Sequence, residues 1–182
     1  MDRKLISLIE KELCDAEMKT EEIPAIDLYM DQIITLIEEK YDANRRTPDE
    51  KILTKTMINN YSKEGLIKPI KGKKYTKEQI MQMLAIYAMK NTLSIQEIKT
   101  ALQGADVASE FDLVEAWEMA LSQKQKQRAV LAELMEELCI TPDCETSKTD
   151  QLASLLAVTS LSCYCQRIAQ QMVELYFKSE LE

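Results

Sequence analysis

The sequence has 182 residues, a net charge of −8, no histidine, and only three glycines and four prolines. So few turn-forming residues exclude a many-stranded β-fold, and the abundance of Leu, Ile, Met, Glu, Lys and Gln favours helices, so we expect an all-α protein. The absence of histidine excludes histidine-dependent hydrolases and the commonest zinc sites.

The sequence also indicates where the protein works. The first residues contain no apolar run of signal-peptide length, and no stretch reaches the roughly 18 apolar residues that a membrane span needs. Five cysteines in such a chain are typical of reduced, inert thiols, and their spacing lacks the paired CxxC of zinc sites. The five are Cys14, Cys139, Cys144, Cys163 and Cys165. We expect a cytoplasmic protein with no metal, no cofactor and no membrane contact.

Basic and acidic residues are unevenly distributed along the chain. Residues 45–77 hold ten basic and three acidic residues, a net charge of +7, whereas the remainder carries 13 basic and 28 acidic residues, a net charge of −15. A local basic patch, and not the whole-chain charge, decides which surface can face a phosphate backbone. Solvated lysines would give the same count, so the residues between the lysines must decide the interpretation.

Two amphipathic helices are predicted before this basic segment. The apolar spacing favours one helix over about residues 2–18 and another over about 27–40, with Pro24 between them. The motif TPDE at 47–50 has the hydroxyl cap, proline and glutamate of a helix N-terminus, and we expect it to open at most a single helical turn.

The segment 54–65 predicts a helix with one polar and one apolar face. Its polar side chains recur at the i, i+3, i+4, i+7 spacing that places them on one stripe. They are Thr56, Asn59, Asn60 and Lys63, and Met57, Ile58 and Tyr61 fall on the opposite face. Gly65 stands where a helix end favours a residue with positive φ.

The next residues predict an extended loop and two more helices. Residues 66–75 combine a proline, a glycine and several lysines, which is typical of a basic wing. Capping boxes at Thr76 and Ser94 then predict one helix to about Lys90 and a short one to about Gln103. We therefore expect the middle of the chain to form a helix that ends sharply, then a basic wing, and then two further helices.

This order is that of a winged helix-turn-helix, in which a recognition helix reads bases and a wing contacts phosphates. Asn can make a bidentate hydrogen bond to adenine in the major groove, and lysines supply phosphate contacts. The alternative is that Asn59 and Asn60 merely face solvent. The candidate DNA-binding residues are Lys55, Thr56, Asn59, Asn60, Lys63, Lys71, Lys73, Lys74 and Tyr75.

The stretch LTKTMINNYSKEGLI at 53–67, followed by Pro69 and KKYTKEQI at 73–80, resembles the DNA-binding domain of MerR-type transcriptional regulators. The family pattern is an aromatic-x-x-x-Gly-Leu corner, a wing that leads to a tyrosine, and a capped helix; Ser94 opens a segment similar to its next helix. The motifs IDLYMDQ (26–32) and LTKTMINNY (53–61) also resemble a bacterial family described as a domain of unknown function. The MerR resemblance, over about residues 50–103, implies a winged helix-turn-helix that binds duplex DNA.

The last third of the chain predicts a long helical hairpin. We expect one helix from about Asp112 to Leu138, a turn at Thr141–Pro142–Asp143, and a second helix over about 150–178. Apolar residues on the second helix alternate at spacings of 3 and 4, which is typical of a heptad seam. The seam comprises Val158, Leu161, Cys165, Ile168, Met172 and Leu175. It can serve a homodimer or an intramolecular bundle, and a dimer would suit a DNA reader.

These patterns divide the chain into an N-terminal helix (1–24), a winged helix-turn-helix domain (25–104) and a helical hairpin for dimerisation or regulation (105–182). We expect a transcriptional regulator that reads bases with helix 54–64 and phosphates with wing 66–75, with an effector that the sequence does not identify. The alternative is a protein–protein interaction module of winged-helix shape. With no P-loop, Gly-rich dinucleotide turn or histidine, we expect no enzyme and no catalytic residue.

Overall fold

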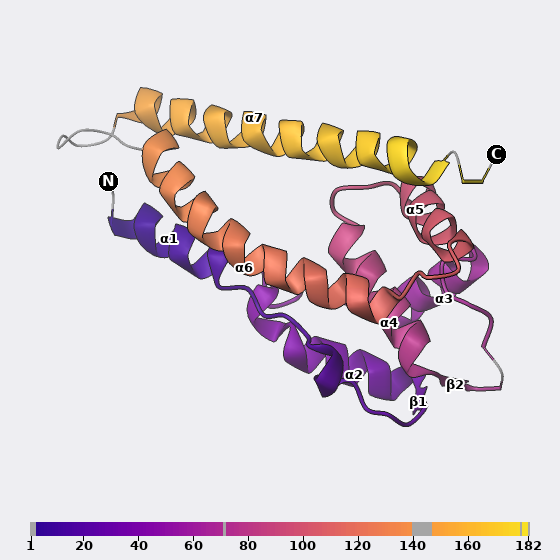
Figure 1. Ribbon diagram of the computed structural model, residues 1–182. Helices are drawn as coiled ribbons and strands as arrows, with labels where there is room; N and C mark the ends of the chain where they lie inside the picture. The colour runs from indigo at the N-terminus through magenta and orange to yellow at the C-terminus, as the bar shows by residue number, and fades with distance from the viewer. Residues whose placement is uncertain (1–2, 71, 140–146, 179, 182) are drawn as a thin grey trace.

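The computed structural model describes residues 3–70, 72–139, 147–178 and 180–181. The described chain is mostly helical, with seven α-helices and one two-stranded antiparallel sheet. Figure 1 shows a compact head from which two long helices, α6 and α7, extend as arms. The predicted helices are therefore confirmed, but the fold also contains a small sheet that an all-α prediction does not include.

The head contains both strands and four of the helices. Their bounds are β1 Leu28–Tyr29, α2 Met30–Lys40, α3 Lys55–Lys63, β2 Lys74–Tyr75, α4 Lys77–Met89 and α5 Ile95–Val107. In the sheet Leu28 pairs with Tyr75 and Tyr29 pairs with Lys74, so the strand before α2 holds the end of the wing. The sequence did not predict this pairing, because two two-residue strands carry no alternating pattern that can be recognised.

Helix α4 is the centre of the core. Every residue from Gln79 to Ile86 is buried, and a helix that is covered all round must lie inside a protein. The side chains that form the core with it come from the stretch before β1, from α2, α3, α5 and the segments between them, and from Leu113 and Trp117 of α6. The fully buried members include Met18, Ile33, Ile37, Ile52, Ile58, Ile80, Met81, Met83, Leu84, Ile86 and Ile98.

The predicted helix starts in the head are confirmed by their caps. The side chains of Thr54, Thr76 and Ser94 accept hydrogen bonds from the third backbone N–H of α3, α4 and α5, respectively. Helix α5 runs four residues further than expected, to Val107. The TPDE motif forms only a turn, in which the N–H of Glu50 bonds to the carbonyl of Thr47 at 3.0 Å.

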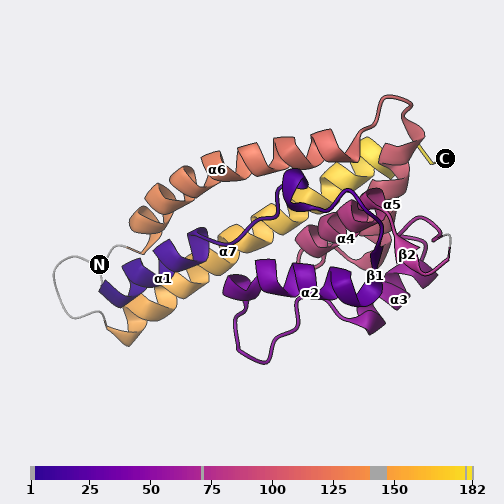
Figure 2. The same ribbon diagram turned by 90° about the horizontal axis from the view of Figure 1, so that it is seen from below.

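The arms are α6 (Leu113–Leu138) and α7 (Lys148–Val173), and α7 ends in a π-helical turn, Glu174–Lys178. Asp112 caps α6 and Ser147 caps α7. The predicted turn at residues 141–143 lies outside the described residues. Figures 1 and 2 show α7 returning toward the head, so that its C-terminal end lies beside α5.

The N-terminal helix α1 (Arg3–Leu13) lies along α6, and it is shorter than the predicted helix over 2–18. The segment after α1 is extended and is fixed to α6 by charge. Asp15 and Glu17 form ion pairs with both Lys124 and Arg128. The two cations interrupt the apolar stripe of α6 because they hold this acidic segment.

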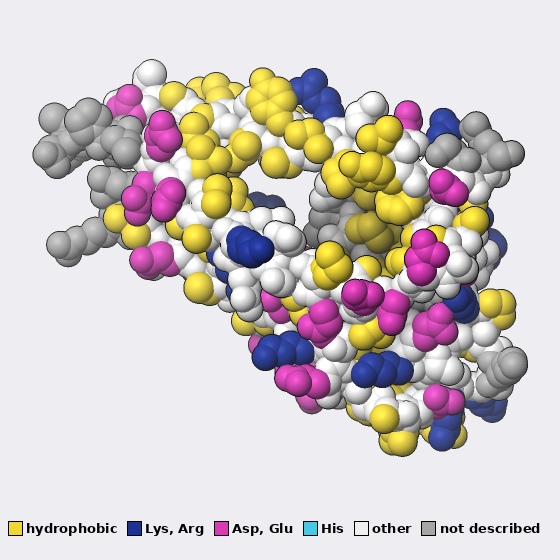
Figure 3. All heavy atoms as spheres, in the orientation of Figure 1, with side chains coloured by type: hydrophobic (Ala, Val, Ile, Leu, Met, Phe, Trp, Pro, Cys, Tyr) yellow, Lys and Arg dark blue, Asp and Glu magenta, His cyan; other side chains and the backbone are white. Residues whose placement is uncertain are grey.

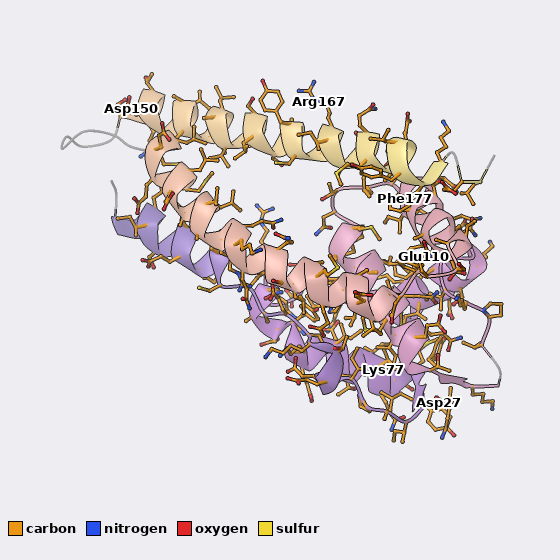
Figure 4. All side chains as sticks on the ribbon, viewed as in Figure 1. Asp27, Lys77, Glu110, Asp150, Arg167 and Phe177 are labelled. Atoms are coloured by element: carbon orange, nitrogen blue, oxygen red, sulfur yellow. The ribbon has the colours of Figure 1, made fainter. Side chains whose placement is uncertain are left out.

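Helix α5 and the end of α7 approach each other very closely. A Cβ atom at Gly104 would lie 2.5 Å from the carbonyl oxygen of Phe177 and 2.7 Å from its Cβ. Glycine at 104 therefore has a packing role, since any side chain would push the π-helical turn away from α5. Figure 4 places Phe177 at this junction.

We predict that Gly104→Ala loosens the end of α7. Alanine favours a helix by about 1 kcal/mol over glycine, but the clash with Phe177 should cost about 1–3 kcal/mol. Hydrogen exchange of the amides in Glu174–Lys178 should therefore accelerate. Gln103→Ala, at an exposed position of the same helix, is the control and should leave exchange there unchanged. Equal exchange in both variants would contradict the packing role.

Candidate nucleic-acid interface

Helix α3 presents the polar face that the sequence predicts. Thr56, Asn59, Asn60 and Lys63 are all exposed. On the opposite side Ile58 is fully buried and Tyr61 is nearly so. Burial raises the pKa of the Tyr61 hydroxyl, which is consistent with an inward-facing ring.

Helix α2 lies against α3, and one carboxylate joins the two. The Oε1 atom of Glu38 accepts hydrogen bonds from the backbone N–H groups of Ile52 (2.9 Å) and Leu53 (3.2 Å), just before α3. Its Oε2 atom pairs with Arg45. One largely buried side chain on α2 thus fixes both the loop and the start of α3.

The chain leaves α3 through a glycine-dependent turn. Gly65 has a φ of +74°, a left-handed conformation that few residues other than glycine adopt. The N–H of Leu66 then reaches the carbonyl of Tyr61 at 2.9 Å, which closes the last helical turn. Leu66 and Ile67 enter the core behind it, so the stop predicted at Gly65 is confirmed.

Two buried glutamines of α4 hold the base of the wing. The Nε2 atom of Gln79 donates to the carbonyls of Lys68 (2.9 Å) and Pro69 (3.1 Å). The Oε1 atom of Gln82 accepts from the N–H of Lys68 at 2.9 Å. The backbone N–H and carbonyl of Lys68 and the carbonyl of Pro69 therefore keep hydrogen-bond partners where they pack on the core. The sequence pattern indicates only the capping box for Gln79 and no role for Gln82.

Besides Arg45, which pairs with Glu38 and Asp42, three basic residues in 45–77 bind groups of their own chain. Lys55 pairs with Asp31 at 2.6 Å, and the Nζ atom of Lys77 donates to the carbonyl of Thr20 at 2.8 Å. Figure 4 labels Lys77 at the start of α4. The third, Lys68, joins the wing to α5.

The ammonium group of Lys68 lies between two carboxylates. It is 2.9 Å from Asp106 on α5 and 2.9 Å from Glu78 on α4. Hydrogen bonds to these carboxylates raise the pKa of Lys68, so its charge is retained and largely neutralised in place. Lys68 therefore secures the wing and contributes little to a basic surface.

Other basic residues of the candidate site are exposed. Lys63 lies on the polar face of α3, and Lys73 and Lys74 lie at the end of the wing. The ammonium group of Lys74 stands 5.0 Å from the centre of the Tyr29 ring, a cation–π geometry. Tyr29 is half exposed beside the wing. No local pattern in the sequence indicates its role, because its pairing with Lys74 across the sheet is a long-range contact.

One of the candidate DNA-binding residues is buried, and another lies outside the described residues. Tyr75 is only 2% exposed, and burial raises the pKa of its hydroxyl. Its ring belongs to the core, because the alternation of strand β2 turns Lys74 outward and Tyr75 inward. Lys71 lies outside the described residues.

A surface pocket of about 970 Å³ lies between the wing base and the junction of α5 with α6. Apolar side chains such as Ile70, Met81, Leu102 and Phe111 line it, together with the ion pair of Lys68 and Asp106. The pocket adjoins the wing and reaches the end of α3 at Ser62 and Gly65, but none of the four residues of the polar face of α3 lines it. Among the described residues no group of His, Cys, Asp and Glu has the arrangement of a metal site.

We predict that Glu38→Ala destabilises the protein by about 2–4 kcal/mol, because it leaves two backbone donors without their acceptor and leaves Arg45 with Asp42 as its remaining ion-pair partner. Urea unfolding measures the loss. Glu39→Ala, at the adjacent exposed position, should change the free energy of unfolding by less than about 0.5 kcal/mol. A loss at Glu38 no larger than at Glu39 would show that the carboxylate does not hold this loop.

Comparisons with known proteins place this geometry in a family. A family model described as a domain of unknown function, DUF1836, matches residues 18–121, which include α2, α3, the wing, α4, α5 and the start of α6. Searches of curated proteins and of solved structures returned no match. The matched segment covers more than half of the chain, and the protein belongs to the DUF1836 family.

Proposed function

We propose that the protein is a sequence-specific duplex-DNA-binding transcriptional regulator. The observation that carries the proposal is the polar face of α3, which stands exposed on a helix held by α2 on one side and followed by the wing on the other. The order of helix, basic wing and helix, which is also that of a winged helix-turn-helix, and the resemblance to MerR-type regulators support it.

The side chains available to DNA divide by chemistry. Asn59, Asn60 and Thr56 carry amide and hydroxyl groups that can hydrogen-bond base edges in the major groove. Lys63, Lys73 and Lys74 are suited to phosphates, which fix register without reading sequence. Lys55 keeps Asp31 as a neighbour, so it would meet a phosphate only by exchanging that partner.

The net charge of −8 would affect how the protein approaches DNA. An acidic protein is repelled by DNA except where a basic patch faces the duplex, so the orientation of approach is restricted. Three exposed lysines give a modest electrostatic contribution, and the affinity should depend correspondingly on salt. Two protomers on a two-fold operator would double the number of such contacts.

A second candidate is a protein–protein interaction module of the same shape. The pairing of Lys55 with Asp31 and of Lys68 with two carboxylates favours it, since this surface already binds acidic groups of its own chain. A gel shift with pooled random duplexes separates the candidates. No shift at low salt would favour the interaction module over the regulator.

We predict that Lys73→Ala/Lys74→Ala weakens binding to specific and random duplexes by the same factor. The plot of log affinity against log salt should become shallower by about two, because each lysine neutralises one phosphate. Lys11→Ala/Lys126→Ala makes the same charge change at exposed positions on α1 and α6, and should leave the slope unchanged. An unaltered slope in the wing variant would remove the wing from the interface.

We predict that Asn59→Ala mainly relaxes specificity. A bidentate contact discriminates against the wrong base by about 1–3 kcal/mol, so selection from random duplexes should lose preference at one base pair of each half-site. Asn91→Ala, at an exposed position in the turn after α4, is the control. Identical selected sequences for Asn59→Ala and the unmodified protein would show that α3 does not read that base.

A further inference from the structure

Helix α7 exposes an unusual amount of apolar surface. Figure 3 shows hydrophobic side chains along most of its length. Eight large ones on α7 and its π-helical turn are exposed: Leu152, Leu155, Leu156, Tyr164, Ile168, Met172, Leu175 and Tyr176. Scattered apolar residues are normal on a protein surface, but a row along one face of a helix marks an interaction site. Five of the eight form such a row on the C-terminal half of α7: Tyr164, Ile168, Met172, Leu175 and Tyr176.

The heptad seam of α7 is covered at its start and bare at its end. Val158 and Leu161 are half-buried, in the part of α7 nearer the turn from α6. Farther along, α6 and α7 separate (Figure 1), and Ile168, Met172 and Leu175 on the same seam are 60%, 47% and 69% exposed. The bare part of the seam thus has the pattern of a helix–helix interface without a second helix.

The other side of α7 is already occupied in this region. The Nε2 atom of Gln166 donates to the carbonyl of Thr92 at 3.1 Å, Val173 is buried, and the π-helical turn contacts α5. The head therefore holds α7 by one face and turns the seam away from itself. A partner can reach the seam without displacing any of these contacts.

The charge pattern of α7 selects the kind of partner. Residues 151–166 contain no charged side chain, in a chain of which 30% is charged. The positions that flank the seam of a coiled coil decide which partners are repelled. On α7 these flanks are uncharged: Ala157, Ser162, Tyr164, Ala169 and Gln171. Two copies of an acidic protein can therefore meet along this helix without the repulsion that their other surfaces would produce.

A membrane is the other apolar environment to consider. The helix Lys148–Lys178 is long and apolar enough to cross a bilayer by length and composition alone. Crossing would detach its end from α5 and break the close contact at Gly104. It would also place nine Gln, Ser and Thr side chains of this helix in lipid. The observed docking at the C-terminal end of α7 favours a protein partner.

We propose that the bare seam of α7 is a homodimer interface, on which the α7 helix of a second copy packs across a two-fold axis. An apolar seam with neutral flanks is complementary to itself, as a two-fold interface requires. A standard interface hides about 800 Å² per partner, and the five large side chains exposed on this face expose roughly 100 Å² each, or about 500 Å² together. The exposed neutral side chains beside them, Ser162 and Gln171, add to this area. The proposal is independent of DNA binding, since the seam lies on an arm and the polar face of α3 lies on the head.

The test compares two double variants of the full-length protein, without DNA, by sedimentation velocity. Ile168→Glu/Met172→Glu places two charges on the bare seam. Leu152→Glu/Leu156→Glu adds the same charges at the same spacing on the opposite face of α7, where the side chains are 56% and 61% exposed. We expect a dimer for the unmodified protein and the Leu152/Leu156 variant. The seam variant should be monomeric, with its dimer Kd raised roughly a hundredfold or more because two charges would be buried.

Circular dichroism verifies that the variants keep their helices. If the seam double variant loses helicity, Leu175→Glu replaces it, at a side chain that is 69% exposed. A monomeric unmodified protein at about 50 μM, which is well above the Kd of a stable dimer, would overturn the proposal. A seam variant that stays dimeric, or equal dissociation of both variants, would also overturn it. Co-sedimentation of the unmodified protein with phosphatidylcholine vesicles would assign α7 to a membrane.

Discussion

The position of the wing depends on two glutamine side chains that are buried at the start of α4. Gln79 and Gln82 satisfy the backbone groups of Lys68 and Pro69, in a segment that belongs to neither helix nor strand. A buried polar group without a partner costs about 1–3 kcal/mol, so the base of the wing has essentially one low-energy place on α4. This position on α4 therefore fixes the path of the chain between its exit from α3 at Gly65 and strand β2.

The parts of the fold that sequence could predict are those governed by short-range rules. The caps at Thr54, Thr76 and Ser94 each involve a backbone group three residues away, and all three start helices. The amphipathicity of α3 follows from the helical repeat, and its polar face is exposed as expected. Gly65 ends α3 because the required backbone conformation is local. The resemblance of 26–61 to a domain of unknown function is likewise confirmed by the family match.

The features that sequence could not predict involve partners distant in the chain. Tyr75 looked like an exposed wing residue, but its strand pairs with Leu28 and turns the ring into the core. The sequence counts Lys68 toward a basic patch, but in the structure its ammonium group lies beside the carboxylate of Asp106, which is 38 residues away in the chain. A net charge summed along the sequence therefore overstates the basic surface. Each ion pair within the chain removes a lysine from the set that can meet a phosphate without losing an existing partner.

Helix α5 connects the two functional surfaces that we propose. Asp106 on α5 holds the wing base through Lys68, and Gly104, two residues earlier, receives the end of α7 at Phe177. The head and the seam of α7 are thus joined by a rigid helix and a contact too close to admit a Cβ atom. If α7 pairs with its copy, this junction sets the separation of the two α3 helices. A fixed separation is what a reader of two half-sites needs, because half-sites on duplex DNA recur only at intervals of one helical turn.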